Sequence, residues 1–323
     1  MSSVGAIVAS SGLSLPSTRV IPRAAPDSAR TRETSTPLLE LFVDALLEAV
    51  RSLQVSTRLR HKGIHSARKA MRRARSILQV ARADLGPEGD TCDYAIKGIC
   101  RDLSAARDAQ AQLDAFDRLA EKGRLTVAPE TQSRARQFLV RRRARIVHGL
   151  LAKDPDFRTL RARLTEALEA AKRLDWNSVR LEDTTSAMAR SVRRALKISQ
   201  RARMSEREQV RHRWRRRMRR SVQQRAVLAS LGNPSGGAGQ ADGMEPAITT
   251  ESAAQAFADL VRLLGLEHDL RVLHATFESA GSFCADERAA LCAAIEAEML
   301  RIARKCARQA DADNTAALPE PAG

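Results

Sequence analysis

The sequence is poor in aromatic residues, which make up 3 % of its 323 positions and include a single tyrosine. Proteins that bind single-stranded nucleic acid usually place aromatic side chains among basic ones, so that bases can stack on them. The chain also has only 16 glycines and 11 prolines, too few turn residues for a loop-rich all-β protein. Because alanine and leucine are plentiful, these shortages predict an all-α protein.

Cysteine pairs, long apolar runs and catalytic motifs are missing as well. The five cysteines form no Cys-x-x-Cys pair, so we expect buried thiols in a reducing cytoplasm and no zinc site. No stretch approaches the roughly 18 apolar residues of a membrane-spanning helix. There is no Gly-x-x-x-x-Gly-Lys-Ser/Thr phosphate loop, and the basic segments carry almost no carboxylates to hold a metal. We therefore predict no catalytic residues, no metal site and no cofactor.

Arginine is what the sequence has in excess. Lysine and arginine number 55 against 38 acidic residues, a net charge of +17, and only 8 of the 55 are lysine. Residues 51–82 hold ten basic and no acidic residues, and residues 190–225 hold fifteen basic and two acidic ones. A guanidinium group binds phosphate oxygens through two parallel hydrogen bonds. The expected partner is a polyanion: nucleic acid, an anionic membrane or a phosphate polymer.

Helical periodicity begins at Leu38 and predicts one helical domain over residues 38–309, with a first half of about 38–174 and a second half of about 184–309. The predicted helices are 38–53, 60–84, 91–121, 131–152, 156–174, 184–203, 206–231, 249–279 and 284–309. Residues 1–37 predict a disordered extension, although an organellar transit peptide has a similar composition. Residues 232–248 predict a flexible loop and residues 310–323 a disordered tail.

One basic motif occurs twice, 147 residues apart, which indicates an internal duplication. We call its two copies the first basic stripe and the second basic stripe. The first comprises His65, Arg68, Lys69, Arg72 and Arg73, and the second comprises His212, Arg215, Arg216, Arg219 and Arg220. On a helix these spacings put the basic residues on one face and the apolar residues on the other. Like charges at this spacing cost about 0.2–0.5 kcal/mol per pair, so an unrelieved stripe that occurs twice indicates a bound anion.

Weaker basic patterns lie on two other predicted helices and could converge with the stripes on one groove. Their members are Arg141, Arg142 and Arg145 on one helix, and Arg190, Arg193, Arg194, Lys197 and Arg201 on the other. A second repeated element has an offset of 161 and relates Arg101, Leu103, Asp108 and Ala111 to Arg262, Leu264, Asp269 and Val272. Its aspartate could orient a basic side chain of the stripes or form an ordinary salt bridge between helices.

The segment from His65 to Ser76, His-Ser-Ala-Arg-Lys-Ala-Met-Arg-Arg-Ala-Arg-Ser, resembles the signature of the CHAD domain, the conserved histidine α-helical domain. Residues 103–108, Leu-Ser-Ala-Ala-Arg-Asp, resemble the Arg-Asp motif that follows it in that family. The resemblance covers about residues 38–309. It implies two pseudo-two-fold-related helical bundles in one compact domain with a basic central groove or channel. The second copy departs from the pattern, with Val222 in the place of Arg75.

The resemblance also implies binding of inorganic polyphosphate in the cytoplasm, often at polyphosphate granules. The predicted binding residues are His65, Arg68, Lys69, Arg72, Arg73, Arg75, Arg141, Arg142, Arg145, Arg194, Lys197, His212, Arg215, Arg216, Arg219 and Arg220. Nearby phosphate favours protonated histidine, so binding is expected to strengthen on mild acidification. The alternatives are a non-specific, architectural nucleic-acid-binding protein and a non-catalytic accessory to a polyphosphate or triphosphate enzyme. Weak non-specific binding of nucleic acid is expected from the charge alone.

Overall fold

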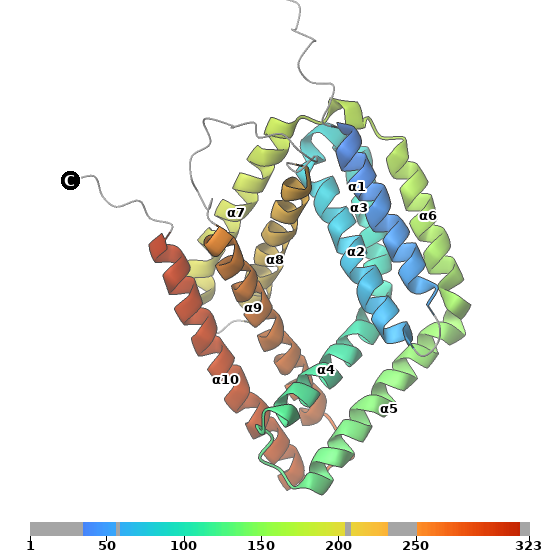
Figure 1. The fold of residues 1–323 in the computed structure, drawn as a ribbon. Coiled ribbons are helices and arrows are strands. Elements are labelled where there is room, and N and C mark those ends of the chain that lie inside the picture. Colours follow the sequence, from blue (N-terminus) through green and yellow to red (C-terminus); the bar gives the residue numbers. More distant parts are fainter. Residues whose placement is uncertain (1–34, 56–58, 204–207, 232–250, 317–323) are drawn as a thin grey trace, which may run out of the picture. The chain divides into compact units, whose positions relative to one another are not determined.

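The computed structural model describes residues 35–55, 59–203, 208–231 and 251–316. These residues form ten α-helices and two 3-10 helices and contain no strand (Figure 1). The prediction of an all-α protein is therefore confirmed. The predicted loop at 232–248, residues 1–34 of the predicted N-terminal extension and residues 317–323 of the predicted C-terminal tail lie outside the described residues. The last helix continues to Ala316, so residues 310–316 of the predicted tail are helical.

The helices follow one another along the chain in the order of their labels. Their bounds are α1 (Ser35–Leu53), α2 (Arg60–Val80), α3 (Arg82–Asp102), α4 (Ser104–Glu121), α5 (Pro129–Lys153), α6 (Arg158–Lys172), α7 (Leu181–Arg203), α8 (Glu208–Leu231), α9 (Glu251–Glu278) and α10 (Ala285–Ala316). The 3-10 helices cover Pro155–Phe157 and Trp176–Ser178. The duplicated basic motif thus lies on α2 and α8, and the second repeated element spans α3 and α4 in the first half and lies on α9 in the second.

The chain departs from the predicted helices around α3. A break was expected at residues 86 and 87, followed by a single helix over 91–121. That break is present: α3 contains a kink at Gly86, whose angles of φ 60° and ψ −153° are non-helical and readily adopted by glycine. The prediction of a single helix over 91–121 was wrong, because α3 ends at Asp102 and α4 begins at Ser104. The residue between them, Leu103, is fully buried. Both segments are amphipathic, so the periodicity alone did not reveal the break.

The apolar faces of α2 and α8 lie in the core, opposite their basic stripes. On α2 the predicted inner residues are buried, including Ile64 (1 % exposed) and Met71 (0 %). On α8 both Trp214 and Met218 are 1 % exposed, whereas Leu228 is only half-buried. The helical phase inferred from the sequence therefore describes α2 well and α8 from Trp214 to Ser221, which is also fully buried.

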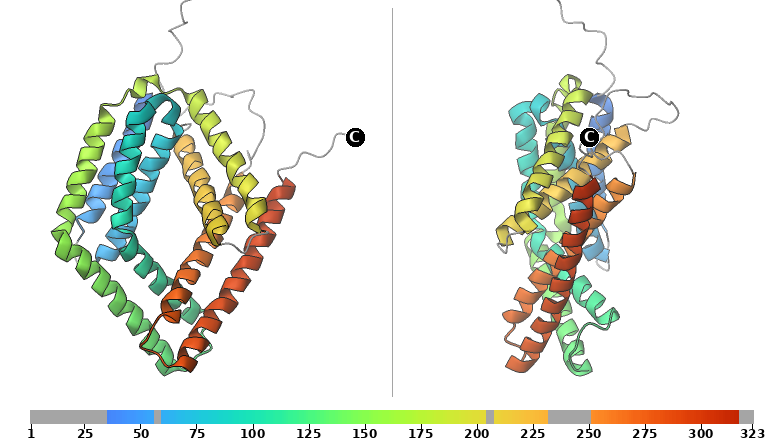
Figure 2. Two further views of the ribbon diagram at one scale, coloured as in Figure 1. Left: turned by 180° about the vertical axis from the view of Figure 1, so that it is seen from behind. Right: turned by 90° about the vertical axis from the view of Figure 1, so that its left-hand side faces the viewer.

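Two hydrophobic clusters make up the core. The first joins α1, α2, α3 and α6, and the second joins α7, α8, α9 and α10 with α4 and the first half of α5. Phe116 of α4 packs against Phe277 of α9 with ring centroids 5.9 Å apart. Although α4 belongs to the first half of the sequence, it thus shares a core with the second half, and the crossing of α4 and α9 is visible from behind (Figure 2).

The helices that carry repeated elements pack against their own counterparts, α2 against α8 and α4 against α9. Ser76 Oγ on α2 lies within hydrogen-bond distance of Gln223 Oε1 on α8, at 3.3 Å, and the two positions are 147 residues apart. This separation equals the offset of the duplicated motif. A position that contacts its own counterpart lies on the axis that relates two copies. Towards their N-terminal ends α2 and α8 diverge (Figure 1).

A candidate polyanion site at the arginine cluster

The two basic stripes meet between α2 and α8. We call five residues the arginine cluster: Arg68 and Arg72 on α2, Arg215 and Arg219 on α8, and Arg107 on α4. The positive charges of this set act on one another across helices. Arg107 and Arg215 both contribute to lowering the pKa of Arg72, and Arg215, Arg72 and Arg68 all contribute to lowering that of Arg219. The structure therefore unites the predicted copies at one site.

The cluster holds its charges at an energetic cost. Burial lowers the pKa of Arg72 to about 10 and that of Arg219 to about 9, and the neighbouring guanidinium groups add to the effect. Both values lie above 7, so both side chains remain protonated at neutral pH. Partly desolvated like charges are stabilised only when an anion or a hydrogen-bond acceptor approaches them. The cluster is thus arranged to gain free energy from a negatively charged ligand.

Part of the cluster is satisfied by the protein itself. Arg68 Nη1 donates to the backbone oxygen of Cys100 and to Ser104 Oγ, the latter at 3.2 Å. The Cys100 carbonyl lies in the last turn of α3, where carbonyl groups lack helical partners and carry partial negative charge. By contrast, Arg68 Nε and Arg72 Nε are buried without a hydrogen-bond partner in the described part of the chain. The arginines are therefore held in place but not saturated.

Asp108 and Asp269, the repeated aspartates, lie close to the cluster. Asp108 raises the pKa of Arg68, and both carboxylates raise that of Arg215, in opposition to burial. Burial in turn raises the pKa of Asp269. Neither carboxylate forms an ion pair with a described residue at 4.0 Å or less, so an ordinary interhelical salt bridge is not observed there. Their influence on the cluster is a partial compensation over a longer distance.

Three histidines border the cluster. His65 is exposed on α2, and its partial burial together with Arg107 and Arg72 lowers its pKa. The rings of His212 and His268 lie 5.3 Å apart between centroids. Burial, followed by the charges of Arg215 and His212, lowers the pKa of His268 to about 4. His268 is therefore neutral at pH 7 in the free protein and can still donate one hydrogen bond from its ring.

A buried carboxylate fixes α8 to α9 beside these histidines. Glu267 is 4 % exposed and accepts from Arg271 at 2.9 Å, and Arg211 lies 3.0 Å from the same oxygen. On the other side of His212 an open cavity of about 300 Å³ is lined by Gln209, His212, Arg213 and Arg216. The helix that carries the second basic stripe is thus held to α9 by an ion pair and borders a cavity that has space for a ligand.

The other predicted residues of the stripes lie around the cluster. Lys69 and Arg216 are exposed, and their charges act on His65 and Arg219 respectively. Arg73 is half-buried on α2, and Arg220 is exposed on α8. Arg75 makes a two-point ion pair with Asp93 of α3, with Nε to Oδ1 at 2.8 Å and Nη2 to Oδ2 at 3.1 Å. Arg75 is therefore already engaged by a carboxylate of the protein.

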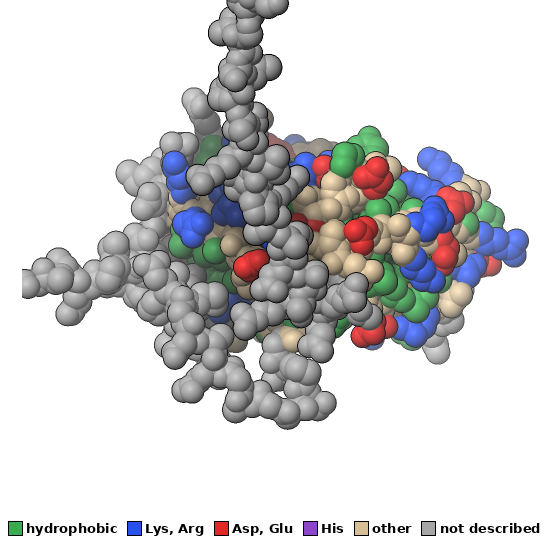
Figure 3. Space-filling model, turned by 90° about the horizontal axis from the view of Figure 1, so that it is seen from above, with side chains coloured by type: hydrophobic (Ala, Val, Ile, Leu, Met, Phe, Trp, Pro, Cys, Tyr) green, Lys and Arg blue, Asp and Glu red, His purple; other side chains and the backbone are tan. Residues whose placement is uncertain are grey.

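The basic residues of the weaker patterns lie on α5 and α7. Within the described residues, no hydrogen bond or ion pair connects them to the arginine cluster. Arg194 and Lys197 lie on the exposed side of α7, and Arg141 and Arg145 are exposed on α5. Arg142 donates instead to Gln112 Oε1 at 3.0 Å. On the face seen from above, basic and acidic side chains are interspersed (Figure 3). The part of this face that the described residues form is thus of mixed charge.

Two residues of the site, Arg107 and His268, were absent from the predicted binding set. Arg107 lowers the pKa of His65, Arg72 and Arg215. A signal for both was present in the sequence, because the two positions are related by the offset of 161 and each precedes a repeated aspartate. Neither position belongs to the basic stripes on α2 and α8, so the pattern of the stripes alone does not find them.

Within the described residues, no group of three or more His, Cys, Asp or Glu side chains could hold a metal ion. None of the helices in the described part of the chain is both long and apolar enough to span a membrane.

Fold and site together define a helical protein with duplicated basic helices that meet at a half-buried arginine cluster. The family model for the CHAD domain matches residues 41–242, and the chain belongs to this family. No curated protein matches the sequence.

Two solved structures share the fold at low sequence identity. The first is PptA from Streptomyces chartreusis, with a TM-score of 0.58 and 14 % identity over 86 % of this chain and 98 % of that chain. The second is the CHAD domain from the plant Ricinus communis, with a TM-score of 0.55 and 15 % identity over 86 % of this chain and 92 % of that chain.

Proposed function

We propose that the chain binds inorganic polyphosphate at the arginine cluster, without catalysing a reaction on it. The observation that carries the proposal is the mutual lowering of arginine pKa values across α2 and α8. A protein keeps like charges together in a desolvated place when a function requires them, and perturbed pKa values gather at functional sites. The CHAD domain family is associated with polyphosphate- and triphosphate-related proteins.

A phosphate polymer fits the chemistry of this site. Each phosphate unit of the chain carries a charge and has oxygens that accept from guanidinium groups, and the polymer has no bases that require aromatic partners. The arginine cluster supplies five cations from three helices. Its unpartnered donors, Arg68 Nε and Arg72 Nε, require side-chain adjustment before they can reach a ligand. His65, His212 and His268 stand at the border of the cluster and would gain protons as phosphate approaches.

In the cell we propose that this binding brings the protein to polyphosphate in the cytoplasm, including polyphosphate granules. Phosphate polymers are the preferred ligand over nucleic acid, because the cluster contains no aromatic side chain on which bases could stack. Weak binding of duplex DNA at low salt is expected from net charge, and it should disappear as salt is raised.

The decisive experiment measures polyphosphate affinity after two charges of the cluster are removed. The variant R72M/R219M keeps the aliphatic stems of both side chains while deleting their guanidinium groups. We expect its dissociation constant for polyphosphate of defined length to rise at least about tenfold, equivalent to about 1.4 kcal/mol. The measurement is made by isothermal titration at fixed salt, with folding verified by circular dichroism.

The control is R304M/R308M, which removes the same net charge from two exposed positions on α10. If both variants lose affinity equally, total charge and not the cluster governs binding, and the proposal is wrong. A competition with duplex DNA of equal phosphate content tests the ligand class. Polyphosphate should remain bound under an excess of DNA, and stoichiometric displacement by DNA would instead identify a nucleic-acid-binding protein.

A further inference from the structure

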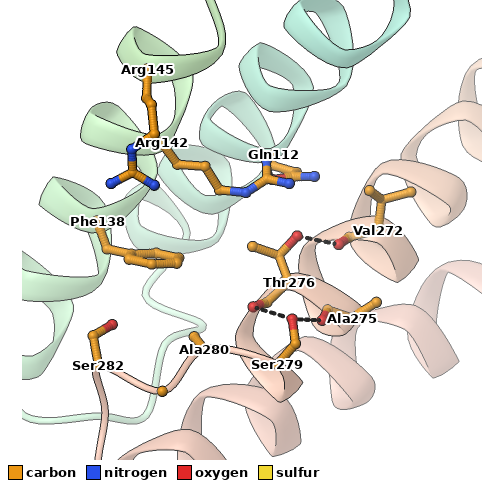
Figure 4. A pocket seen from close by; sticks show the side chains of 11 residues that line it. Gln112, Phe138, Arg142, Arg145, Val272, Ala275, Thr276, Ser279, Ala280 and Ser282 are labelled. Atoms are coloured by element: carbon orange, nitrogen blue, oxygen red, sulfur yellow. Dashed lines mark hydrogen bonds between the residues drawn. The ribbon is translucent and has the colours of Figure 1, made fainter.

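A cavity of about 580 Å³ lies between α4, α5 and α9, beside the connection from α9 to α10 (Figure 4). This volume lies in the range that pockets for small organic molecules occupy. Its walls divide into a cationic side from α4 and α5 and an apolar side from α5, α9 and the connection. No function described so far uses this pocket.

The cationic side is built from two arginines and a buried amide. Gln112 is 2 % exposed, and its Oε1 accepts from Arg142 Nη1 at 3.0 Å. Because the oxygen of this amide is occupied, its Nε2 group is left as the donor on the pocket side. Arg145 lies beside Arg142 at the same border of the pocket (Figure 4). Two guanidinium groups and an amide N–H therefore face one end of the cavity.

Beside the arginines, on the same helix α5, Phe138 offers an ordered aromatic surface (Figure 4). Phe138 is fixed by Phe283 and Phe277, with ring centroids 5.6 Å and 6.1 Å away. The hydroxyl groups of Thr276 and Ser279 already donate to backbone oxygens of α9, at 3.0 Å and 2.9 Å. The free hydrogen-bond donors of the pocket therefore lie at its arginine end. The remaining wall can pack against the apolar part of a ligand.

The pocket and the arginine cluster fit different kinds of ligand. The cluster presents cations from three helices to an extended chain of charges. The pocket has its cations at one end only, and a bare phosphate polymer would leave the face of Phe138 uncovered. Arg142 and Arg145 are not among the charges that act most strongly on the pKa of Arg72 or Arg219, and Arg142 donates to Gln112 instead. The pocket is thus lined by cations other than those of the cluster.

We propose that this pocket binds a small anion with one phosphate, sulfonate or carboxylate group on a flat apolar body. The anionic group lies against Arg142, Arg145 and Gln112, and the apolar body lies on Phe138. The site is independent of polyphosphate binding, and it assigns to Arg142 and Arg145 a role different from holding the polymer.

The test uses phenyl phosphate as the probe, followed by ligand-detected NMR saturation transfer and by calorimetric titration. Saturation should reach the ring protons of the probe, and inorganic phosphate should compete at least about tenfold less well than phenyl phosphate, because it lacks the apolar body. Benzoate and benzenesulfonate, tested in parallel, identify which anionic group is preferred.

Three variants separate the possible outcomes. R145M alters an exposed side chain without disturbing the core, and R142M/R145M removes both cations; they should weaken phenyl phosphate binding about threefold and at least about tenfold, respectively. R72M/R219M, which tests the polyphosphate proposal, should bind phenyl phosphate as the unmodified protein does. Absence of saturation transfer, or equal binding by R142M/R145M, overturns the pocket. Loss of polyphosphate affinity in R142M/R145M without any phenyl phosphate binding would assign these arginines to the polymer site instead.

Discussion

The two copies of the basic element use the same framework with different charges. In the first copy, α2 is accompanied by Arg107 on α4, whose charge is permanent. In the second, α8 is accompanied by His268 on α9, at the position 161 residues later, and this side chain is neutral at pH 7 because its pKa is about 4. One half of the site is therefore always charged at this position, whereas the other acquires its charge only when a proton binds.

The copies also differ in how they hold their first arginine. Arg68 donates to a carbonyl in the last turn of α3, which is accessible because the chain interrupts the helix at Leu103. The counterpart of Leu103 is Leu264, which lies inside the continuous helix α9. No helix end is available to Arg215 there, and Asp269 is instead the largest charge that raises its pKa. Both arginines are influenced by a carboxylate, but the break at Leu103 gives Arg68 an additional hydrogen bond to a backbone carbonyl at a helix end.

The largest expected effect comes from making the first copy resemble the second. R107H replaces the permanent charge that acts on both stripes with a titratable one. We expect polyphosphate affinity at pH 7.5 to fall about tenfold, or about 1.4 kcal/mol, and to recover in part at pH 5.5. Calorimetric titration at both pH values checks this. An unchanged affinity at pH 7.5 would show that Arg107 does not act on the ligand.

The reverse exchange, H268R, should give a smaller gain. The approach of phosphate raises the pKa of His268 from its free value of about 4, so binding takes up a proton and affinity rises as pH falls from 7.5. Because arginine at position 268 is already charged, the variant takes up no proton there, and this contribution to the pH dependence of affinity is lost. The variant should bind about threefold more tightly at pH 7.5 and respond less to pH. A pH response as steep as that of the unmodified protein would place the linked proton elsewhere, on His65 or His212.

Stability should respond differently to the removal of equivalent arginines. R68M deletes the hydrogen bonds to Cys100 and Ser104 and should lower the free energy of unfolding by about 1 kcal/mol. R215M removes a like charge from the cluster without deleting such a bond, so its stability should stay equal or rise. Thermal unfolding without ligand should separate the two by about 2–4 °C. Equal destabilisation of both variants would remove the distinction drawn between the two copies.

The smallest effect is expected at the ion pair that only the first copy contains. Arg75 pairs with Asp93, with side chains 21 % and 20 % exposed, and Val222 occupies the equivalent position on α8. R75M should cost up to about 1 kcal/mol of stability and change polyphosphate affinity less than about twofold. Urea unfolding and calorimetry measure the two quantities. A tenfold loss of affinity would show that Arg75 leaves Asp93 to bind the ligand.

The sequence was sufficient to predict the all-α class and which side of α2 is buried. Both follow from helical periodicity, which depends only on residues close together in the sequence. The paired stripes could also be predicted, since two helices with the same rare pattern must bury the same face. The same kind of pattern suggested that the basic residues of α5 and α7 converge with the stripes on one groove, but no hydrogen bond or ion pair of the described residues joins them to the cluster. Whether a basic stripe faces the cluster depends on the packing of distant helices, and Arg142 lies in a separate pocket with Gln112.

Arg107 and His268 show a second limit. Their positions follow from the offset of 161, yet their proximity to both stripes results from the crossing of α4 and α9 beside α2 and α8. Similarly, the break at Leu103 becomes understandable only when the guanidinium group of Arg68 is seen at the end of α3. Such features combine local sequence with contacts made over more than 30 residues, which a pattern within one helix does not contain.

The contact between Ser76 and Gln223 has an evolutionary consequence. Two identical subunits related by a two-fold axis place the same residue on both sides of that axis. Here the two sides belong to one chain, so a mutation on one side is not copied to the other. Joined subunits can specialise where separate identical ones cannot, and the difference between Arg107 and His268 at equivalent positions is one that a single chain permits.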